Sequence, residues 1–142
     1  MTNSDLQLFF TQQCDFLNKG LHQEFADGFG FPLPVQHGED LEVHSTVNAF
    51  LGWLGSQDSW LTLEEGQYFQ YAVTAVDPPR EGRFRAYVTV SVMGPNEQRL
   101  GLAKATYYMR QKPGGFAIEM VNCPGVQMTV AAKREEPRYR VS

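Results

Sequence analysis

Apolar residues near the start of the chain recur at the spacing of an α-helix. They return every three or four positions, at Leu6, Phe10, Cys14, Leu17 and Leu21. This spacing places them on one side of a helix that can lie on a sheet. Polar residues at positions 3–5 can cap the first turn, and Gly20 can end the helix.

A second helix is predicted over residues 45–54. Its apolar residues fit the i, i+3, i+4, i+7 pattern, at Val47, Phe50, Leu51 and Leu54. Between the two helices, a short helical turn at 21–26 is followed by an extended segment at 29–35. Two prolines in that segment remove backbone donors, so we expect it to lie at an edge of a sheet.

From residue 67 onward the pattern becomes that of β-strands. The segments rich in β-branched and aromatic residues are 67–77, 83–93, 99–110 and 115–123. Short connections rich in Pro and Gly separate them, and such connections join antiparallel neighbours. The expected fold class is therefore α+β, with a long, curled antiparallel meander packed against the N-terminal helices.

Alternation along these strands gives two faces, and both are partly apolar. In 84–92 the even-numbered residues are apolar and the odd-numbered ones are polar or aromatic. In the last strand, strict alternation places Glu119 on the same face as Val121 and Cys123. One face must cover the helices, and the other would leave a broad apolar patch in water. A second copy would cover it, so we expect a homodimer that packs through the sheet face.

The composition is that of an ordinary globular protein. The chain has 142 residues, of which 42% are hydrophobic and 20% are charged, which is typical of neither disordered nor fibrous chains. We expect one domain over residues 1–132. A charged and flexible C-terminal tail is expected at 133–142, where acidic residues interrupt the basic ones.

Charge and segment lengths exclude several kinds of partner and setting. The formal net charge of −4 argues against nucleic acid, because binding phosphates needs a concentrated basic face. No apolar run approaches the roughly 20 residues of a membrane span, and the first residues lack the pattern of a secretory signal.

The two cysteines have no metal-type spacing. We expect them to be small core residues in a reduced, cytoplasmic setting, the alternative being a reactive thiol.

The order of these elements resembles the nuclear-transport-factor-2-like superfamily over roughly residues 4–123. The most recognisable parts are the step from Phe25-Ala26-Asp27 into the extended segment, the helix at 45–54, and a closing hairpin with KATYYMR and GGFAIEMVNC. The resemblance implies a cone-shaped pocket between a curved sheet and the helices. It also implies frequent homodimers.

The catalytic residues of that superfamily do not carry over. Its ketosteroid isomerases have a Tyr on the first helix as an oxyanion donor, whereas this helix has Gln12, Gln13 and Cys14. Its dehydratases use paired histidines, and this chain has only His22, His37 and His44. The leading expectation is therefore a domain that binds a small apolar molecule, without assigned catalysis. The alternatives are a cofactor-free isomerase, dehydratase or cyclase acting by proton transfer on a polyketide- or steroid-like compound, and a non-catalytic accessory subunit.

If the chain is an enzyme, the candidate catalytic residues are Glu119, Asp27 and Tyr107. Glu119 would have a raised pKa and could act as a general base or acid if it pointed into an apolar cone. The alternative for Glu119 is an ion pair with Lys104, Arg85 or Arg110, or simple exposure. Asp27 could be a base, or it could form a turn or helix cap with Gly28.

The candidate pocket residues are aromatic or small. Tyr107, Tyr68 and Tyr87 could donate to a ligand carbonyl, although strand tyrosines are more often core or interface residues. Trp53 and Trp60 are expected to close the core or the pocket mouth, and Cys123 to line the pocket. No phosphate loop, nucleophile elbow or metal-ligand spacing is present. No cofactor or metal is therefore expected.

Overall fold

The computed structural model describes residues 2–56, 61, 63–125 and 127–128. Within these residues the helices are α1 (Asn3–Asn18), α2 (His22–Ala26) and α3 (Val47–Leu54). The strands are β1 (Leu33–His37), β2 (Asp40–His44), β3 (Tyr68–Val76), β4 (Arg83–Met93), β5 (Arg99–Lys112), β6 (Gly115–Cys123) and β7 (Gln127–Met128). Trp60 and the tail predicted at 133–142 lie outside the described residues.

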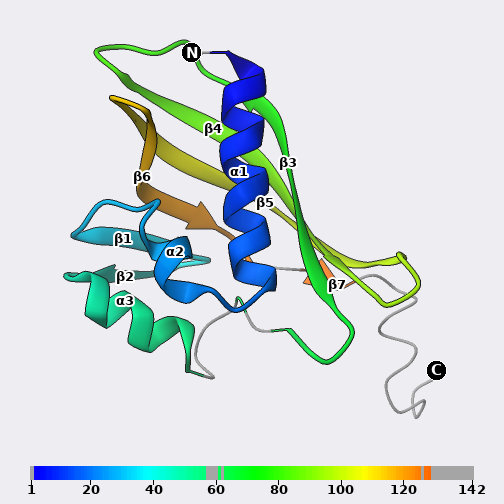
Figure 1. Ribbon diagram of the computed structural model, residues 1–142. Helices are drawn as coiled ribbons and strands as arrows, with labels where there is room; N and C mark the ends of the chain where they lie inside the picture. Colours follow the sequence, from blue (N-terminus) through cyan, green and yellow to red (C-terminus); the bar gives the residue numbers. More distant parts are fainter. Residues whose placement is uncertain (1, 57–60, 62, 126, 129–142) are drawn as a thin grey trace.

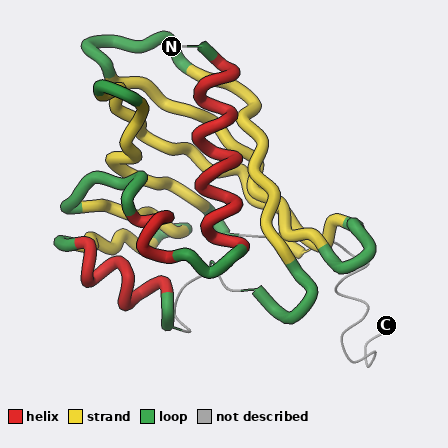
Figure 2. The backbone as a smooth tube through the Cα atoms, in the orientation of Figure 1, coloured by secondary structure: helices red, strands yellow, loops and turns green. Residues whose placement is uncertain are grey.

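The strands form one curved, open sheet. Its order is β2-β1-β6-β5-β4-β3, and β7 pairs with β5 outside this path. Neighbours along the path are antiparallel except β1 and β6, which are parallel. Figures 1 and 2 show α1 lying along one side of the sheet, with α2 and α3 beside β1 and β2. The predicted α+β cone and the antiparallel meander of β3 to β6 are confirmed.

The extended segment that was predicted to lie at an edge contributes β1 instead, which lies inside the sheet. β1 forms a hairpin with β2 on one side and a parallel pair with β6 on the other. The pairing with β6 starts at Val35, opposite Val121, after the last proline of the segment. Because the prolines precede this ladder, their missing N–H groups do not interrupt it.

One side of α1 fills the concave side of the sheet. Leu6 and Phe10 are fully buried, and Leu17 is nearly so. Thr2 begins the helix with a capping box, in which Thr2 Oγ1 accepts from the Asp5 amide at 3.0 Å and Asp5 Oδ2 accepts from the Thr2 amide at 3.3 Å. The cap is therefore one residue earlier than the predicted positions 3–5.

A β-bulge in β6 changes which of its side chains face the core. Tyr108 pairs with Met120 and Met109 pairs with Ile118, so Glu119 is the extra residue. An extra residue shifts the alternation of the strand by one. Ile118 and Val121 are accordingly both buried although they are three positions apart. The prediction that Glu119 shares a face with Val121 and Cys123 is therefore wrong.

Side chains of α1 pair with the outer backbone edge of β3. Asn18 Oδ1 accepts from the Phe69 amide at 2.7 Å, and Asn18 Nδ2 donates to the Phe69 carbonyl at 2.9 Å. The Cys14 thiol donates to the same carbonyl at 3.1 Å. Two helical turns before Cys14, Gln7 Oε1 accepts from the Val73 amide at 2.9 Å. These side chains supply the hydrogen bonds that a neighbouring strand would otherwise make.

Replacing Asn18 by Ala is expected to lower the free energy of unfolding by about 1–2 kcal/mol. The Phe69 amide loses its partner, and the Phe69 carbonyl keeps only the bond from the Cys14 thiol. Urea unfolding monitored by circular dichroism measures this change. Gln12→Ala is the control, since Gln12 is exposed on the same helix. An Asn18→Ala change no larger than that of the control would contradict the role given to this side chain.

Candidate functional site

The space between the helices and the sheet, where the resemblance implies a pocket, is filled with aromatic rings. Phe25, Phe29 and Phe50 pack with ring centroids between 4.9 and 6.2 Å apart. A cavity lined by described residues among these rings has a volume of about 20 Å³, enough for one water molecule. Its walls are Phe25, Phe29, Val35, Phe50, Trp53, Leu61, Tyr107 and Val121.

Two phenols and two thiols are buried close to one another in this interior. Tyr107 lines the cavity, and Tyr71, Cys14 and Cys123 are near enough to influence its ionisation. Burial raises the pKa of all four groups, that of Cys14 to about 11. They therefore stay protonated at neutral pH. Here they can serve as hydrogen-bond donors but not as bases.

The residues predicted to line one pocket do not all lie around the same cavity. Trp53 lines the interior cavity, and Cys123 is fully buried in the core. Tyr68 is half-buried at the start of β3. Tyr87 has its hydroxyl near Asp77, to which it donates over 3.3 Å. The structure thus gathers Trp53 and Tyr107 around one cavity, and Tyr68 and Tyr87 are not among the residues that line it.

Glu119 lies at the surface between two arginines. Arg83 Nε donates to Glu119 Oε1 at 3.0 Å, and Arg110 Nε donates to Glu119 Oε2 at 2.9 Å. Partial burial, the largest single influence, would raise the pKa of Glu119, but the hydrogen bonds and charges of the two arginines lower it by more. The ion pair with Arg110, one of the alternatives considered from the sequence, is present. A carboxylate held ionised in this way is a weak general base.

Asp27 is exposed at the end of α2. It is the C-cap residue of that helix, and its Oδ1 accepts from Gln23 Nε2 at 3.3 Å. The next residue must be small, because a Cβ on Gly28 would lie 2.6 Å from Gln13 Nε2. The Asp27-Gly28 pair therefore ends a helix, as the structural alternative proposed.

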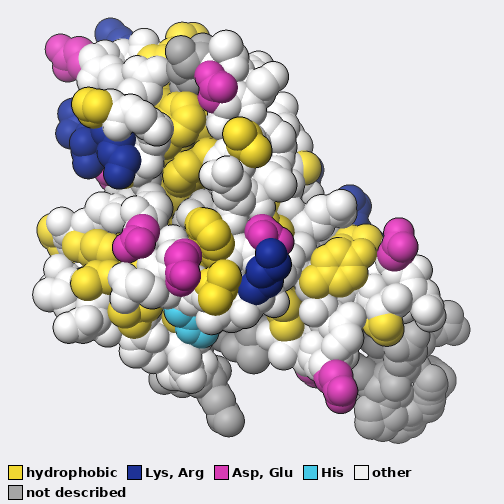
Figure 3. Space-filling model, viewed as in Figure 1, with side chains coloured by type: hydrophobic (Ala, Val, Ile, Leu, Met, Phe, Trp, Pro, Cys, Tyr) yellow, Lys and Arg dark blue, Asp and Glu magenta, His cyan; other side chains and the backbone are white. Residues whose placement is uncertain are grey.

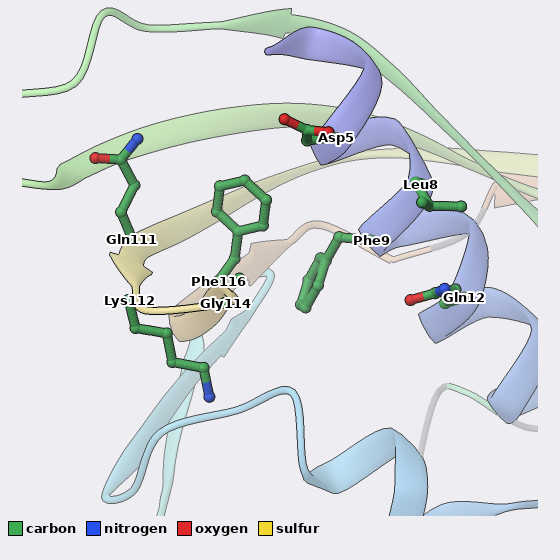
Figure 4. A pocket seen from close by; sticks show the side chains of 9 residues that line it. Asp5, Leu8, Phe9, Gln12, Gln111, Lys112, Gly114 and Phe116 are labelled. Atoms are coloured by element: carbon green, nitrogen blue, oxygen red, sulfur yellow. The ribbon is translucent and has the colours of Figure 1, made fainter. Parts of the chain in front are cut away.

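A larger hollow lies between α1 and the β5–β6 hairpin. We call it the hairpin groove; Figure 4 shows Phe9 and Phe116 pointing into it from opposite sides. Its volume is about 550 Å³. The two rings are 5.7 Å apart, edge to face. Its walls are Asp5, Leu8, Phe9, Gln12, Gln111, Lys112, Gly114, Gly115 and Phe116.

The hairpin groove has an apolar floor and polar rims. Figure 3 shows hydrophobic side chains at the bottom of a hollow beside α1 and basic side chains gathered across from the helix. Asp5 and Gln12 come from the helix, whereas Gln111 and Lys112 come from the hairpin. Such a surface suits a ligand with an apolar body and a polar end.

Sequence reasoning missed the hairpin groove because its two halves are more than 100 positions apart in the chain. Phe9 was recognisable only as a residue that widens the apolar side of the first helix. Phe116 was recognisable only as one apolar position of a strand. The sequence shows only that Phe9 stands next to Phe10; that Phe10 is fully buried and Phe9 only partly so is seen in the structure alone.

Comparisons with known proteins give the fold. No family model and no curated protein matches the sequence, but solved structures do. A domain of unknown function with a cystatin-like fold from Nostoc punctiforme has a TM-score of 0.67 at 17% identity, covering 94% of this chain and 83% of that one. An NTF2-like protein with a cystatin-like fold from Novosphingobium aromaticivorans has a TM-score of 0.68 at 9% identity, covering 92% and 86%.

A hexachlorocyclohexane dehydrochlorinase also matches, with a TM-score of 0.66 at 10% identity, covering 90% of this chain and 88% of that one. This chain has the nuclear-transport-factor-2-like fold. The resemblance seen in the sequence is confirmed at the level of the fold. Proteins of this fold include both enzymes and domains of unknown function, so the nuclear-transport-factor-2-like fold does not by itself define an activity.

In this nuclear-transport-factor-2-like fold, the described His, Cys, Asp and Glu side chains form no group of three or more that could hold a metal ion. His44 is buried against Phe50 and Trp53, and burial lowers its pKa. It is therefore neutral at pH 7. No helix in the described part of the chain is long and apolar enough to cross a membrane.

The lowered pKa of Glu119 predicts a pH-dependent contribution to stability. Because the folded pKa is below the unfolded one, the contribution is present above the unfolded value, near 4.3. It is lost as the pH falls through the folded value. Glu119→Gln is expected to lower the free energy of unfolding at pH 7 by no more than about 1 kcal/mol, since all three side chains of these ion pairs remain in contact with solvent. The difference from wild type should vanish at acidic pH.

Urea midpoints of wild type and Glu119→Gln measured between pH 2.5 and pH 7 test this. Glu97→Gln is the control, because Glu97 is exposed and makes no ion pair with a described residue. A wild-type advantage that persists unchanged at the lowest pH would show that the ion pairs are not its source.

Proposed function

We propose that this protein is a non-catalytic binding domain that holds a small, largely apolar molecule in the hairpin groove. The observation that carries the proposal is the pair of aromatic rings, Phe9 and Phe116, at the base of a hollow of about 550 Å³. Ligand pockets typically have volumes above roughly 300 Å³ and apolar walls with a few polar groups. The hairpin groove has the required volume, and its floor is apolar although its rims are polar.

The hairpin groove is a better candidate than the interior of the cone. The interior cavity of about 20 Å³ has no room for an organic ligand. Opening it would separate rings such as Phe25 and Phe50, which are almost completely buried. Removing buried aromatic contacts costs several kcal/mol. The groove needs no such rearrangement.

Polar groups on the rims favour a ligand that carries one hydrogen-bonding end. The amides of Gln12 and Gln111 can each donate and accept, and Lys112 can donate to an acidic or carbonyl oxygen. Leu8, whose exposure is 57%, extends the apolar surface toward solvent. The expected ligand therefore lies with its apolar body on the two rings and its polar end at the rim.

The main alternative is a cofactor-free isomerase, dehydratase or cyclase, as in some proteins of similar structure. Proton transfer would need a carboxylate and a hydrogen-bond donor that face one cavity. Among the described residues, the interior cavity has the donor Tyr107 and no carboxylate. The groove has the carboxylate of Asp5 together with donors on Gln12 and Lys112. However, Asp5 is exposed and already caps α1 by accepting from the Thr2 amide. These positions favour binding over catalysis.

A change of Leu8 to Glu is expected to weaken binding of a neutral apolar probe at least about tenfold, because a charge then faces the aromatic floor. Fluorescence titration with N-phenyl-1-naphthylamine measures the affinity. Native mass spectrometry of the purified protein tests in parallel whether a small molecule is already bound.

Leu21→Glu is the matched control. Leu21 is also an exposed leucine, at 39%, but it is not among the residues that line the groove. Equal losses in the two variants, or no binding by the wild type, would overturn the proposal.

The second proposal is the homodimer expected from the sequence, in which the outer sheet face packs against a second copy. The observation that favours it is a pair of exposed apolar side chains on β2, Leu41 at 57% and Val43 at 54%. They alternate along the strand, so both belong to one face. Such residues are costly to leave in water as part of a larger patch. A homodimer through this face would cover them.

Val43→Glu is expected to convert a dimer to a monomer, because two buried carboxylates would meet across a two-fold axis. Light scattering after gel filtration measures the mass. Leu8→Glu is the control, since Leu8 lies on α1, away from β2. A wild-type monomer at micromolar concentrations, or an unchanged mass for Val43→Glu, would rule out this interface.

A further inference from the structure

Another hollow, distinct from the hairpin groove, lies where β3 connects to β4. We call it the arginine hollow. Its volume is about 600 Å³. Its walls come from the β3–β4 connection, from the first residues of β4 and from the end of β5, and are Asp77, Pro78, Arg80, Arg83, Phe84, Arg85, Tyr108, Met109 and Glu119.

Two carboxylates hold the guanidinium groups of this region in place. Glu119 accepts from Arg83 Nε and Arg110 Nε at 3.0 and 2.9 Å. Asp77 Oδ2 accepts from Arg85 Nε at 2.7 Å. The outward turn of Glu119 comes from the β6 bulge. The bulge thus places the Glu119 carboxylate between two arginines of different strands.

The terminal NH₂ groups of these arginines remain available to donate hydrogen bonds to a ligand. In the described part of the chain, Arg83, Arg85 and Arg110 each make their ion pair through Nε. Arg80 is exposed and makes no ion pair with a described residue. A guanidinium group has five N–H donors in a fixed fork that matches the oxygens of a carboxylate or phosphate. Guanidinium groups that are held in position but not saturated favour such an anion.

The arginine hollow is also unusually basic for this chain. Arg80, Arg83, Arg85 and Arg110 are four of the eight Lys and Arg residues between positions 2 and 128. The nearby carboxylates are Asp77, Glu81 and Glu119, which leaves a formal charge of +1. The whole chain has −4. The other residues between positions 2 and 128 include four basic and eleven acidic ones. Within this part of the chain, an anion is therefore drawn to the arginine hollow.

The base of the hollow is apolar. Phe84 and Met109 are buried beneath it, and Pro78 and Tyr108 stand at its sides. Inorganic phosphate would leave these surfaces in water. We infer that the arginine hollow is a binding site for a small organic anion, with a carboxylate or phosphate group on the arginines and an apolar body over Phe84 and Met109.

The test uses phenyl phosphate as probe, with isothermal titration calorimetry at constant ionic strength. The expected dissociation constant is on the order of a few millimolar, as a ligand of this size typically reaches. Benzoate is expected to bind comparably if the carboxylate class is accepted. Inorganic phosphate and the neutral benzyl alcohol should each bind at least about fivefold more weakly, because each has only one half of the recognised chemistry.

Variants locate the site. Arg80→Gln and Arg83→Gln are each expected to weaken phenyl phosphate binding about threefold to tenfold. Arg83→Lys should recover only part of the loss, since it keeps the charge but not the fork. Arg80→Gln has no ion pair to disturb, so its fold should be unchanged by circular dichroism. Arg99→Gln is the matched control, an exposed arginine at the far end of β5.

Several outcomes would overturn the inference. One is an equal loss in Arg99→Gln and Arg80→Gln, which would indicate diffuse attraction to positive charge. Another is binding of benzyl alcohol as tight as that of phenyl phosphate. A third is loss of phenyl phosphate binding in Lys112→Gln instead, which would place the anion in the hairpin groove. Absence of saturable binding by the wild type would also reject the site.

Discussion

An edge strand presents a row of backbone donors and acceptors that must be paired, and in this protein α1 pairs those of β3. Asn18, Cys14 and Gln7 lie on one side of the helix and bond to Phe69 and Val73. These bonds fix both the rotation of α1 and its position along the strand. The rotation turns Leu6 and Phe10 into the core. It also leaves Phe9 beside Phe116 at the base of the hairpin groove.

The aromatic content of the chain then determines where a ligand can bind. Phe25, Phe29 and Phe50 meet at the narrow end of the cone and leave almost no free volume there. The similar structures share the architecture at identities of only 9–17%. Among the described residues of this chain, the larger hollows lie beside α1 and at the ends of the long strands.

The periodic parts of the sequence predicted the fold well, and the irregular parts did not. Helices and long strands repeat a local pattern many times, so α1 and the β3–β6 meander were predictable from residues such as Leu6, Phe10 and Val88. The bulge at Glu119 has no such signal. When a strand is partly apolar on both faces, its sequence looks the same with one inserted residue as it does with strict alternation. Its pairing with Arg83 and Arg110 required tertiary geometry. So did the hairpin groove, which joins residues from opposite ends of the chain.

The protection of β3 by α1 makes the two edges of the sheet unequal. At the other edge, the outer side of β2 makes no backbone hydrogen bond within the described residues. A sheet grows into a fibre only when every added chain offers a fresh edge to the next. Among the described residues, each chain has one open edge, at β2, and one edge, at β3, whose backbone groups already bond to its own helix. If two chains paired through their β2 edges, only the two β3 edges would remain, and α1 protects these from a third chain.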